Sequence, residues 1–476
     1  MITVFVSGRF NVLHPGHVRL LKFARESGDR LIVAVEPDLS STDSVLVPER
    51  LRLEGVRSCS YVDEAFLLEG SAVDAILKHR PAIVVKGKEH QYRQNEERSA
   101  VESYGGKLIF SSGEVSFTSR DLVRQEFSAA SSRKLTPPLA FMARHGISTL
   151  RLEELLLRFQ NVRVLVIGDL IVDEYISCDP LGMSQEDPTL VVRPVDSKRF
   201  IGGAGIVAAH ASGLSGQSTL VSVVGADAEA DFARSSLNQL GVRAELFDDP
   251  TRPTTLKTRY RCQGKTLLRV SRLNQTSMVP EIGEQIASSV KRQIGEVDLV
   301  IFSDFNYGVL AQEVVEELSG LLQSTDATMC ADSQSSSQFG DVARFKGMDL
   351  LTPTEREARL SVRNTSDGLN VLGESLRSMA SARHVILKLG QQGALICPSG
   401  EPNQISSPDQ IEALNTDPKD VAGAGDSLLT VSGMALAVGA TIWEAACLGS
   451  IAAAIQVGRL GNTAISMEEM LTSLKR

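Results

Sequence analysis

The sequence predicts a two-domain α/β protein, with each domain built on a parallel sheet. Three observations support this prediction. Short β-branched runs alternate with helical patterns from the first residue, a small and polar segment interrupts the alternation near residues 128–140, and the alternation then resumes. Strand–helix–strand alternation is typical of parallel sheets. A length of 476 residues, with 42% hydrophobic and 22% charged residues, suffices for two or three domains with sizeable cores.

The first domain is expected to span residues 1–130. Its strand-like runs lie at residues 2–6, 31–35, 61–67, 82–85 and 107–110, and a potential helix separates each run from the next. The opening run reads as a buried strand, without the basic region and long apolar stretch of a secretory signal. We therefore expect a protein without an export signal.

Residues 131–148 are expected to form a linker, because residues 128–140 are small, polar and proline-containing. The second domain then spans 149–476, with a helical pattern at 150–159 and strands at 162–167, 219–224, 299–302, 328–331 and 385–389. The most apolar stretch, 431–457, is interrupted by Glu444 and is rich in Gly and Ala. We expect it to form packed core helices rather than a membrane span.

Charge and cysteine usage exclude several classes of protein. A net charge of −9 argues against a nucleic-acid binder, which needs a basic face. The six cysteines include no C-x-x-C pair, so neither a disulfide framework nor a zinc site is indicated. These features favour a cytoplasmic protein that binds neither nucleic acid nor membrane.

Two histidines lie where the first strand meets the first helix. Residues 2–6 run into Ser7-Gly-Arg-Phe-Asn-Val-Leu-His14-Pro-Gly-His17, and helical spacing follows. The carboxyl edge of a parallel sheet and the N–H groups of a helix start are suited to binding an anion. Two imidazoles there can donate hydrogen bonds to a phosphoryl group during displacement at phosphorus. A metal site, which lacks a third ligand nearby, and two structural histidines are the alternatives.

The His-x-Gly-His pattern resembles the nucleotidyltransferase superfamily, and the sugar-phosphate adenylyltransferase branch most closely. Residues 50–56, 61–64, 85–88 and 113–119 carry further similarity, whereas Arg9, Asn11 and Phe117 depart from the family pattern. The resemblance implies a Rossmann-like domain in which His14 and His17 stabilise the transition state at the α-phosphorus and Mg²⁺ arrives with the nucleotide. It implies nucleotide contacts for Gly8, Lys22, Thr118 and Ser119, and sugar-phosphate contacts for Lys86 or Lys88. A solvated surface position is the alternative for each lysine.

The segment Asp420-Val-Ala-Gly-Ala-Gly-Asp426 precedes a helix of small residues. Gly423, Ala424 and Gly425 allow consecutive backbone N–H groups to converge at the helix N-terminus, which forms a nest for phosphoryl oxygens. Asp426 is then placed to take a proton from an attacking hydroxyl. Read alone, the same pattern also fits an ordinary turn.

This segment resembles the signature of the ribokinase-like (PfkB) sugar kinases, and the similarity continues at residues 168–173, 200–205 and 387–393. It implies an α/β domain with a small β lid, catalysis by Asp426 and Mg²⁺ coordination by Glu357. The implied nucleotide contacts are Lys388, Gly390, Gly393, Gly423, Ala424 and Gly425. The implied sugar contacts are Asp173, Ser184, Gly202, Gly203 and Asp304.

Residues 183–188, 255–259, 303–305 and 351–353 resemble the kinase half of the bifunctional ADP-heptose synthases, which usually carry the kinase first, whereas here the order is reversed. This resemblance implies phosphorylation of heptose 7-phosphate by ATP, adenylyl transfer to heptose 1-phosphate, and a homodimer formed through the kinase domain. The chain departs from the pattern at Ile206, Tyr307, Thr354 and Ala422. A catalytically silent kinase-like module, another sugar phosphate, or CTP in the transferase therefore stay open as alternatives.

Overall fold

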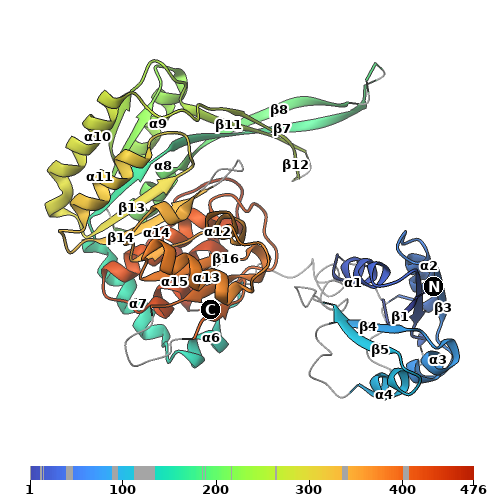
Figure 1. The fold of residues 1–476 in the computed structure, drawn as a ribbon. Coiled ribbons are helices and arrows are strands. Elements are labelled where there is room, and N and C mark those ends of the chain that lie inside the picture. The colour runs from blue at the N-terminus through green and yellow to red at the C-terminus, as the bar shows by residue number, and fades with distance from the viewer. Residues whose placement is uncertain are drawn as a thin grey trace. The chain divides into compact units, whose positions relative to one another are not determined.

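The computed structural model describes residues 2–10, 13, 15–38, 47–87, 95–111, 135–184, 186–187, 189–215, 217–262, 265–334, 341–399 and 407–475. The chain divides into two compact units, Met1–Ser132 and Arg133–Arg476 (Figure 1). Both are α/β units built on parallel strands, which confirms the fold class that the sequence predicts.

The first unit is a five-stranded parallel sheet in the order β3-β2-β1-β4-β5. Its strands are β1 (Thr3–Gly8), β2 (Arg30–Val35), β3 (Glu64–Leu67), β4 (Ile83–Gly87) and β5 (Lys107–Ser111), and its helices are α1 (Pro15–Glu26), α2 (Glu49–Arg57), α3 (Ala72–His79) and α4 (Glu96–Glu102). Alternate residues of β1 face opposite sides of the sheet. Val4 and Val6 pack with α1 and α2, and Phe5 packs with α3 and α4. The sheet is therefore covered on both faces, as its apolar strands require.

The second unit contains a nine-stranded sheet in the order β10-β9-β6-β13-β14-β15-β16-β17-β18. The strands are β6 (Val164–Gly168), β9 (Ser218–Val224), β10 (Arg243–Asp248), β13 (Leu299–Asp304), β14 (Thr328–Ser333), β15 (Leu350–Leu351), β16 (His384–Lys388), β17 (Ala394–Cys397) and β18 (Asp409–Ile411). The pairs from β10 to β16 are parallel, and the last two pairs are antiparallel. Parallel strands end together, so β6, β13, β14 and β16 present their carboxyl ends at one edge.

Helices cover both faces of this sheet (Figure 1). They are α6 (Leu139–Arg144), α7 (Thr149–Arg158), α8 (Ala204–Ser215), α9 (Ala228–Gln239), α10 (Pro280–Gln293), α11 (Gln312–Leu322), α12 (Glu355–Val362), α13 (Leu369–Ala380), α14 (Ala424–Ala437), α15 (Ile442–Val457) and α16 (Met467–Leu474), with short 3₁₀ turns at Phe159–Asn161, Ile294–Glu296, Val342–Arg344 and Gly390–Gln392. One core cluster joins α7, α8, α14 and α15 to the sheet, and another joins α10, α11 and α13 to its opposite face.

A separate four-stranded sheet forms the lid that the resemblance implies. Its order is β12-β11-β7-β8, with β7 (Leu170–Met183), β8 (Leu190–Gly203), β11 (Thr255–Cys262) and β12 (Lys265–Arg272). The inner ends of β7 and β8 are buried, whereas their outer halves are largely exposed. Figure 1 shows this hairpin projecting beyond the rest of the second unit.

The predicted linker is wrong over residues 135–148, because this stretch belongs to the second unit. Phe141, Met142 and Ile147 lie in the main core cluster with α7 and α15. Leu135 forms a β-bridge with Asn415. Prolines and small residues give this segment the composition of a linker. Burial of its few apolar side chains nevertheless holds it against the second unit. We call residues 135–148 the strap.

The apolar stretch at 431–457 forms α14 and α15, which are buried in the core as expected. Within the described parts of the chain, no helix has both the length and the hydropathy needed to cross a bilayer.

Candidate active site

A cavity of about 550 Å³ lies in the second unit, between the lid and the carboxyl edge of the nine-stranded sheet. Its walls come from segments far apart in the sequence. They are the lid residues Asp173, Lys257 and Arg259, the end of β16, the start of α12, and the turn before α14. A cavity of this size suits a small-molecule ligand.

The glycine-containing turn forms the start of α14. Gly423 is the residue before the helix and has a φ of +77°, a left-handed conformation that glycine adopts without strain. Ala424, Gly425 and Asp426 form the first turn of the helix, where backbone N–H groups lack partners within the helix. These groups and the helix dipole make the turn an anion-binding site. All three residues and Gly423 line the cavity.

Asp426 lines the cavity and is only 6% exposed. Burial raises the pKa of Asp426 to about 7, and the charge of Asp332 adds to this effect while Lys388 and Lys257 oppose it. A carboxyl group with a pKa near neutrality is suited to accept a proton from an attacking hydroxyl. The geometry thus places a carboxyl group suited to act as a general base beside the anion-binding turn.

Lys388 brings a positive charge to the same turn. Its Nζ lies 2.5 Å from Oδ2 of Asp332, and a Cβ built on Gly425 would be 3.0 Å from the same Nζ. Burial alone would lower the pKa of Lys388, but the nearby carboxylates of Asp332 and Glu357 outweigh burial and raise it. Lys388 therefore stays charged beside the place where an anion would bind.

On the lid side, Asp173 is 4% exposed and held from two directions. Its carboxylate accepts hydrogen bonds from Arg259 of β11 and from Nδ2 of Asn462, the latter at 3.0 Å. Gly202 of β8 lies directly beside it, because a Cβ at this position would overlap the carboxylate. Asp173 is thus fixed at the cavity wall, where its remaining acceptor capacity can serve hydroxyl groups of a ligand.

Glu357 lines the cavity at the first turn of α12. Its Oε2 accepts a hydrogen bond from the backbone N–H of Thr354 at 2.7 Å, while Oγ1 of Thr354 caps the helix in return. No group of three potential ligands that could hold a metal is found in the described parts of the chain. Mg²⁺ usually binds one or two carboxylates together with phosphates and waters, so it needs no such cage. The pair Glu357 and Asp332, whose Oδ1 is buried without a hydrogen-bond partner, fits this requirement.

The cavity gathers most of the residues that the sequence singles out in this unit. Those lining it are Asp173, Gly203, Glu357, Lys388, Gly390, Gly393, Gly423, Ala424, Gly425 and Asp426. Three predicted sugar contacts are not among the lining residues, although one of them, Gly202, lies beside Asp173. Ser184 is at the tip of the β7–β8 hairpin, roughly 36 Å along the strand from Asp173 at about 3.3 Å per residue. Asp304 is fully engaged by Ser333, Arg344 and the backbone of Asn306, outside the described cavity lining.

The departures from the family pattern have structural explanations. Ile206 is 1% exposed and packs in the main core cluster. Tyr307 is buried, with Lys257 Nζ 5.2 Å from its ring centroid. Thr354 forms the helix cap with Glu357. Ala422 lines the cavity beside the anion-binding turn.

In the first unit, β1 ends at Gly8 and α1 begins at Pro15, so the predicted strand–turn–helix arrangement is present. His17 lies in the first turn of α1, and its ring centroid is 5.0 Å from that of Phe10. Phe10 has a φ of +49°, a strained conformation for a residue with a side chain. His14, Lys88, Thr118 and Ser119 lie outside the described residues.

Two predicted ligand-binding lysines of the first unit, Lys86 and Lys22, are ion-paired. Lys86 Nζ is 2.5 Å from Oε1 of Glu97, and both side chains are largely buried. Lys86 is therefore an ion-pair partner of α4, and its contact with a sugar phosphate stays a prediction. Lys22 is exposed and lies 3.8 Å from Glu26, one turn further along α1. Such an exposed pair contributes little and leaves Lys22 able to move toward a ligand.

Comparison with known proteins agrees with this geometry. Residues 162–470 match the pfkB family of carbohydrate kinases, which is more than half of the chain. The chain belongs to the PfkB carbohydrate kinase family. Residues 5–111 match the cytidylyltransferase-like family, so the first unit is a nucleotidyltransferase-like domain that precedes the PfkB unit.

Curated relatives of this chain are named as bifunctional proteins. A protein of Desulfatibacillum aliphaticivorans named bifunctional protein HldE is 30% identical over 322 residues, which cover 67% of this chain and 64% of the relative. The bifunctional protein HldE of Helicobacter hepaticus is 30% identical over 324 residues, 66% of this chain and 64% of the relative. The chain thus spans about 64% of the length of these relatives.

Solved structures confirm the fold of the PfkB unit. Ribokinase from Thermotoga maritima superposes with a TM-score of 0.53 at 19% identity, covering 66% of this chain and 100% of the ribokinase. Phosphofructokinase-2 from Escherichia coli gives a TM-score of 0.55 at 17% identity, with the same coverage.

Several residues of the PfkB site were not assigned from the sequence. Lys257 and Arg259 lie two apart on β11, so both face the same side of the lid sheet and reach the cavity. Two basic residues at this spacing in a strand could have been identified as site candidates from the sequence. Asn462 follows α15 in a loop and Asp332 ends β14, and nothing local in the sequence marks either of them.

Proposed function

We propose that the chain makes ADP-heptose in two steps. The PfkB unit transfers the γ-phosphate of ATP to the anomeric hydroxyl of heptose 7-phosphate. After another enzyme removes the 7-phosphate, the first unit joins ATP to heptose 1-phosphate and releases pyrophosphate. The observation that carries the proposal is Asp426 beside the Gly423–Gly425 turn, facing Asp173 across one cavity. The similarity to proteins named bifunctional HldE supports the pairing of two activities.

In the kinase reaction, Asp173, held by Arg259 and Asn462, accepts hydrogen bonds from sugar hydroxyls. Asp426 takes the proton of the anomeric hydroxyl, the new O–P bond forms at the γ-phosphorus, and the bond to the bridging oxygen of ADP breaks. The backbone N–H groups of Gly423, Ala424 and Gly425 and the Lys388 ammonium stabilise the charge on the transferring group. Gly390 and Gly393 are assigned to the nucleotide, and Gly202 and Gly203 to the sugar.

Glu357 and Asp332 are assigned to hold Mg²⁺, which when bound neutralises charge on the phosphates of ATP. Glu357 lines the cavity, and Asp332 pairs with Lys388, which also lines it. Oε2 of Glu357 accepts the N–H of Thr354, and a carboxylate can bind Mg²⁺ directly or through water.

In the transferase reaction, a phosphate oxygen of heptose 1-phosphate attacks the α-phosphorus of ATP and pyrophosphate leaves. This attacking oxygen carries no proton, so the reaction needs no general base. His14 and His17 are assigned to the transition state, and Lys22 to pyrophosphate. Gly8, Thr118 and Ser119 are assigned to the nucleotide, and Lys88 takes the sugar phosphate because Lys86 is paired with Glu97.

We also propose a cytoplasmic homodimer formed through the lid. All six cysteines are free, as in proteins of a reducing compartment. Strands β7, β8 and β12 expose large apolar side chains at Leu181, Met183, Leu190, Val191, Val195, Leu267, Leu268 and Val270. Alternate residues of a strand face opposite sides of the sheet, so a second copy packed on one face of the lid would cover the apolar side chains of that face. Sedimentation of Leu268→Glu as a monomer, against a dimeric wild type, is the expected result.

The decisive experiment is mass spectrometry of the products formed from heptose 7-phosphate and heptose 1-phosphate with each nucleoside triphosphate. We expect heptose 1,7-bisphosphate from the first sugar and ADP-heptose from the second, with ATP preferred. His17→Ala should lower only nucleotidyl transfer, by roughly 10²–10³-fold, and Asp426→Asn only phosphorylation, by roughly 10²–10⁴-fold. If ATP binds but no sugar phosphate is phosphorylated, the PfkB unit is a silent binding module.

A further inference from the structure

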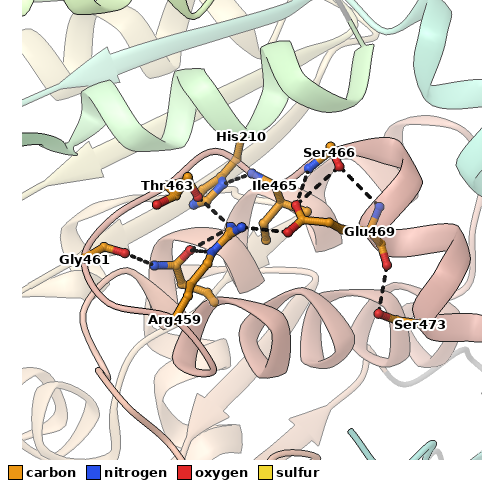
Figure 2. Close-up of polar contacts among 9 residues, drawn as sticks. His210, Arg459, Gly461, Thr463, Ile465, Ser466, Glu469 and Ser473 are labelled. Atoms are coloured by element: carbon orange, nitrogen blue, oxygen red, sulfur yellow. Dashed lines mark hydrogen bonds and ion pairs between the residues drawn. The ribbon is translucent and has the colours of Figure 1, made fainter. Parts of the chain in front are cut away.

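Arg459 holds the loop between α15 and α16 in place through hydrogen bonds. Figure 2 shows its guanidinium donating to the backbone oxygen of Thr463 at 2.6 Å and pairing with Oε1 of Glu469 at 2.9 Å. Oε2 of Glu469 accepts the N–H of Ser466 and so caps α16. Arg459 is thereby fixed between the end of α15 and the start of α16.

Arg459 also fixes the side chain of Gln456, which is fully buried at the end of α15. Nε and Nη2 of Arg459 donate to Oε1 of Gln456 at 3.2 and 3.1 Å. Since the oxygen of the amide faces the guanidinium, its Nε2 must point the other way. Nε2 donates to the backbone oxygens of Ala422 at 3.2 Å and Gly461 at 3.0 Å.

The carboxylate of Asp420 accepts hydrogen bonds from the backbone N–H groups of the same two residues, Ala422 and Gly461. Its Oδ1 accepts the N–H of Ala422, and its Oδ2 accepts the N–H of Gly461, both at 3.1 Å. The hydroxyl of Tyr175 on the lid strand β7 donates to Oδ2 at 2.7 Å. Ala422 and Gly461 are therefore each held at N–H and C=O by the pair Asp420 and Gln456.

These two backbone positions adjoin the two halves of the candidate site. Ala422 precedes Gly423, the residue that opens the anion-binding turn. Gly461 precedes Asn462, which holds Asp173 on the sugar side. We infer that Gln456, oriented by Arg459, is a positioning residue that sets the distance between the anion-binding turn and the Asp173 contact. This inference rests on the proposed kinase function.

A positioning role predicts a particular kinetic effect. Loss of the Gln456 amide leaves ATP able to bind, since its contacts with the turn and with Lys388 persist. Transfer slows, because a displacement of about 1 Å between reacting groups costs roughly 100-fold in rate. The expected signature is therefore a fall in kcat with little change in KM.

The test uses the full chain with Gln456→Met, which keeps the length of the side chain and removes its amide. Ser432→Ala is the matched control, because it removes another fully buried hydrogen bond, from Oγ to the backbone oxygen of Ala445, away from the cavity lining. Sugar-dependent ADP release and peptide-level hydrogen exchange are measured for both. We expect Gln456→Met to lower kcat roughly 10- to 100-fold with KM for ATP within about threefold, and Arg459→Lys to retain more activity than Arg459→Met.

Hydrogen exchange separates this inference from the proposed function. In Gln456→Met, exchange should rise in both 420–426 and 458–463, and in Ser432→Ala it should rise in neither. Unchanged exchange in these segments, or a kcat equal to that of Ser432→Ala, overturns the inference. If the wild-type chain phosphorylates no sugar phosphate, the proposed function fails, and the exchange result alone then decides whether Gln456 holds the two segments together.

Discussion

Protonation of Asp426, the proposed general base, links the proposed catalysis to stability. Its pKa rises from 3.8 to about 7 because the carboxyl group is buried and Asp332 is near. The folded chain thus binds this proton more tightly than the unfolded chain does. Its contribution to stability is fully present below pH 4 and is lost as pH rises through about 7. Catalysis has the opposite dependence, since the base must be deprotonated.

We therefore predict that Asp426→Asn gains stability relative to the wild type as pH rises from 4 to 8. The asparagine carries no charge at any pH, so it avoids the cost of burying a carboxylate. Urea unfolding at pH 5 and pH 8 measures the difference. A constant difference across this range would show that Asp426 ionises in the folded chain as readily as in water. The wild-type kcat/KM for phosphorylation should rise through pH 7 over the same interval.

Lys388 and Asp332 give a second prediction at this scale. Lys388→Met leaves Asp332 buried without its partner, which costs about 3–5 kcal/mol in unfolding free energy. The double variant Lys388→Met/Asp332→Asn should recover most of that stability, because no charge is then stranded. Phosphorylation should stay low in both, since the cation beside Gly425 is missing from each and the double variant also lacks a proposed Mg²⁺ ligand. Recovery of activity together with stability in the double variant would show that Lys388 acts only as the partner of Asp332.

Ile206 provides a third prediction. It stands where the family pattern has a sugar-binding Asn, but its side chain is buried among α7, α8 and sheet residues. Ile206→Asn should therefore destabilise the fold by about 3 kcal/mol or more, from lost packing and an unpaired amide. It should not improve kcat/KM for heptose 7-phosphate. Ile206→Val, which costs about 0.5–1.5 kcal/mol, is the control, and a gain of activity in Ile206→Asn would contradict the packing argument.

At the scale of elements, the strap stabilises one wall of the cavity. Arg144 forms two hydrogen bonds with Asp409, at 2.8 and 3.1 Å, and His145 Nε2 lies 2.8 Å from the same carboxylate. The backbone N–H of Thr136 donates to the oxygen of Leu414. Residues 412–415, directly after β18, line the cavity. The strap therefore holds a loop that lines the cavity.

We predict that the double variant Arg144→Ala/His145→Ala raises KM for ATP roughly fivefold, the equivalent of about 1 kcal/mol. The variant removes the interactions with Asp409 that hold the loop at 412–415 in place. The turn at Gly423–Asp426 keeps all of its contacts. Arg163→Ala is the control, because the guanidinium of Arg163 likewise forms a bidentate ion pair with Asp298. The two arginine side chains are similarly exposed. Equal KM values in both variants would show that the strap contributes stability alone.

The elements differ in how well the sequence predicts them. The central strands, such as β2 and β13, are buried on both faces, and their continuous apolar runs mark them within a residue or two. The third strand begins at Glu64 rather than residue 61, because the residues before it form a turn. The lid strand β12 is exposed along its whole length and carries no such pattern, so the lid was expected from family resemblance alone.

The candidate site divides in the same way. The turn at Gly423–Asp426 is contiguous, so its chemistry is readable from the sequence. Asp173, Lys388 and Asp426 meet through the packing of separate strands and a helix, and family resemblance supplied their association. The pairing of Lys86 with Glu97 could not be predicted, because Glu97 lies on another element. The hairpin carries Ser184 away from the cavity, which no local pattern reveals.

At the scale of the whole molecule, the two compact units predict that the chain can be divided. The fragments Met1–Ser132 and Arg133–Arg476, expressed separately, should each be soluble, the first with nucleotidyl transfer and the second with phosphorylation. A fragment starting at residue 149 lacks the strap and should unfold at a lower temperature than one starting at 133. Thermal unfolding and the two product assays measure these outcomes. Activity that returns only when the halves are mixed would show that one unit completes the site of the other.

The strap also has a consequence for synthesis of the chain on the ribosome. Its Arg144 pairs with Asp409, which lies 265 residues later. At about 5–20 residues per second, the two are made roughly 13–50 seconds apart. Throughout that interval Phe141, Met142 and Ile147 have emerged without the helices that later bury them. The speed of translation therefore sets how long this apolar segment stays open to chaperones, and to the nascent chains of neighbouring ribosomes, before the second unit closes over it.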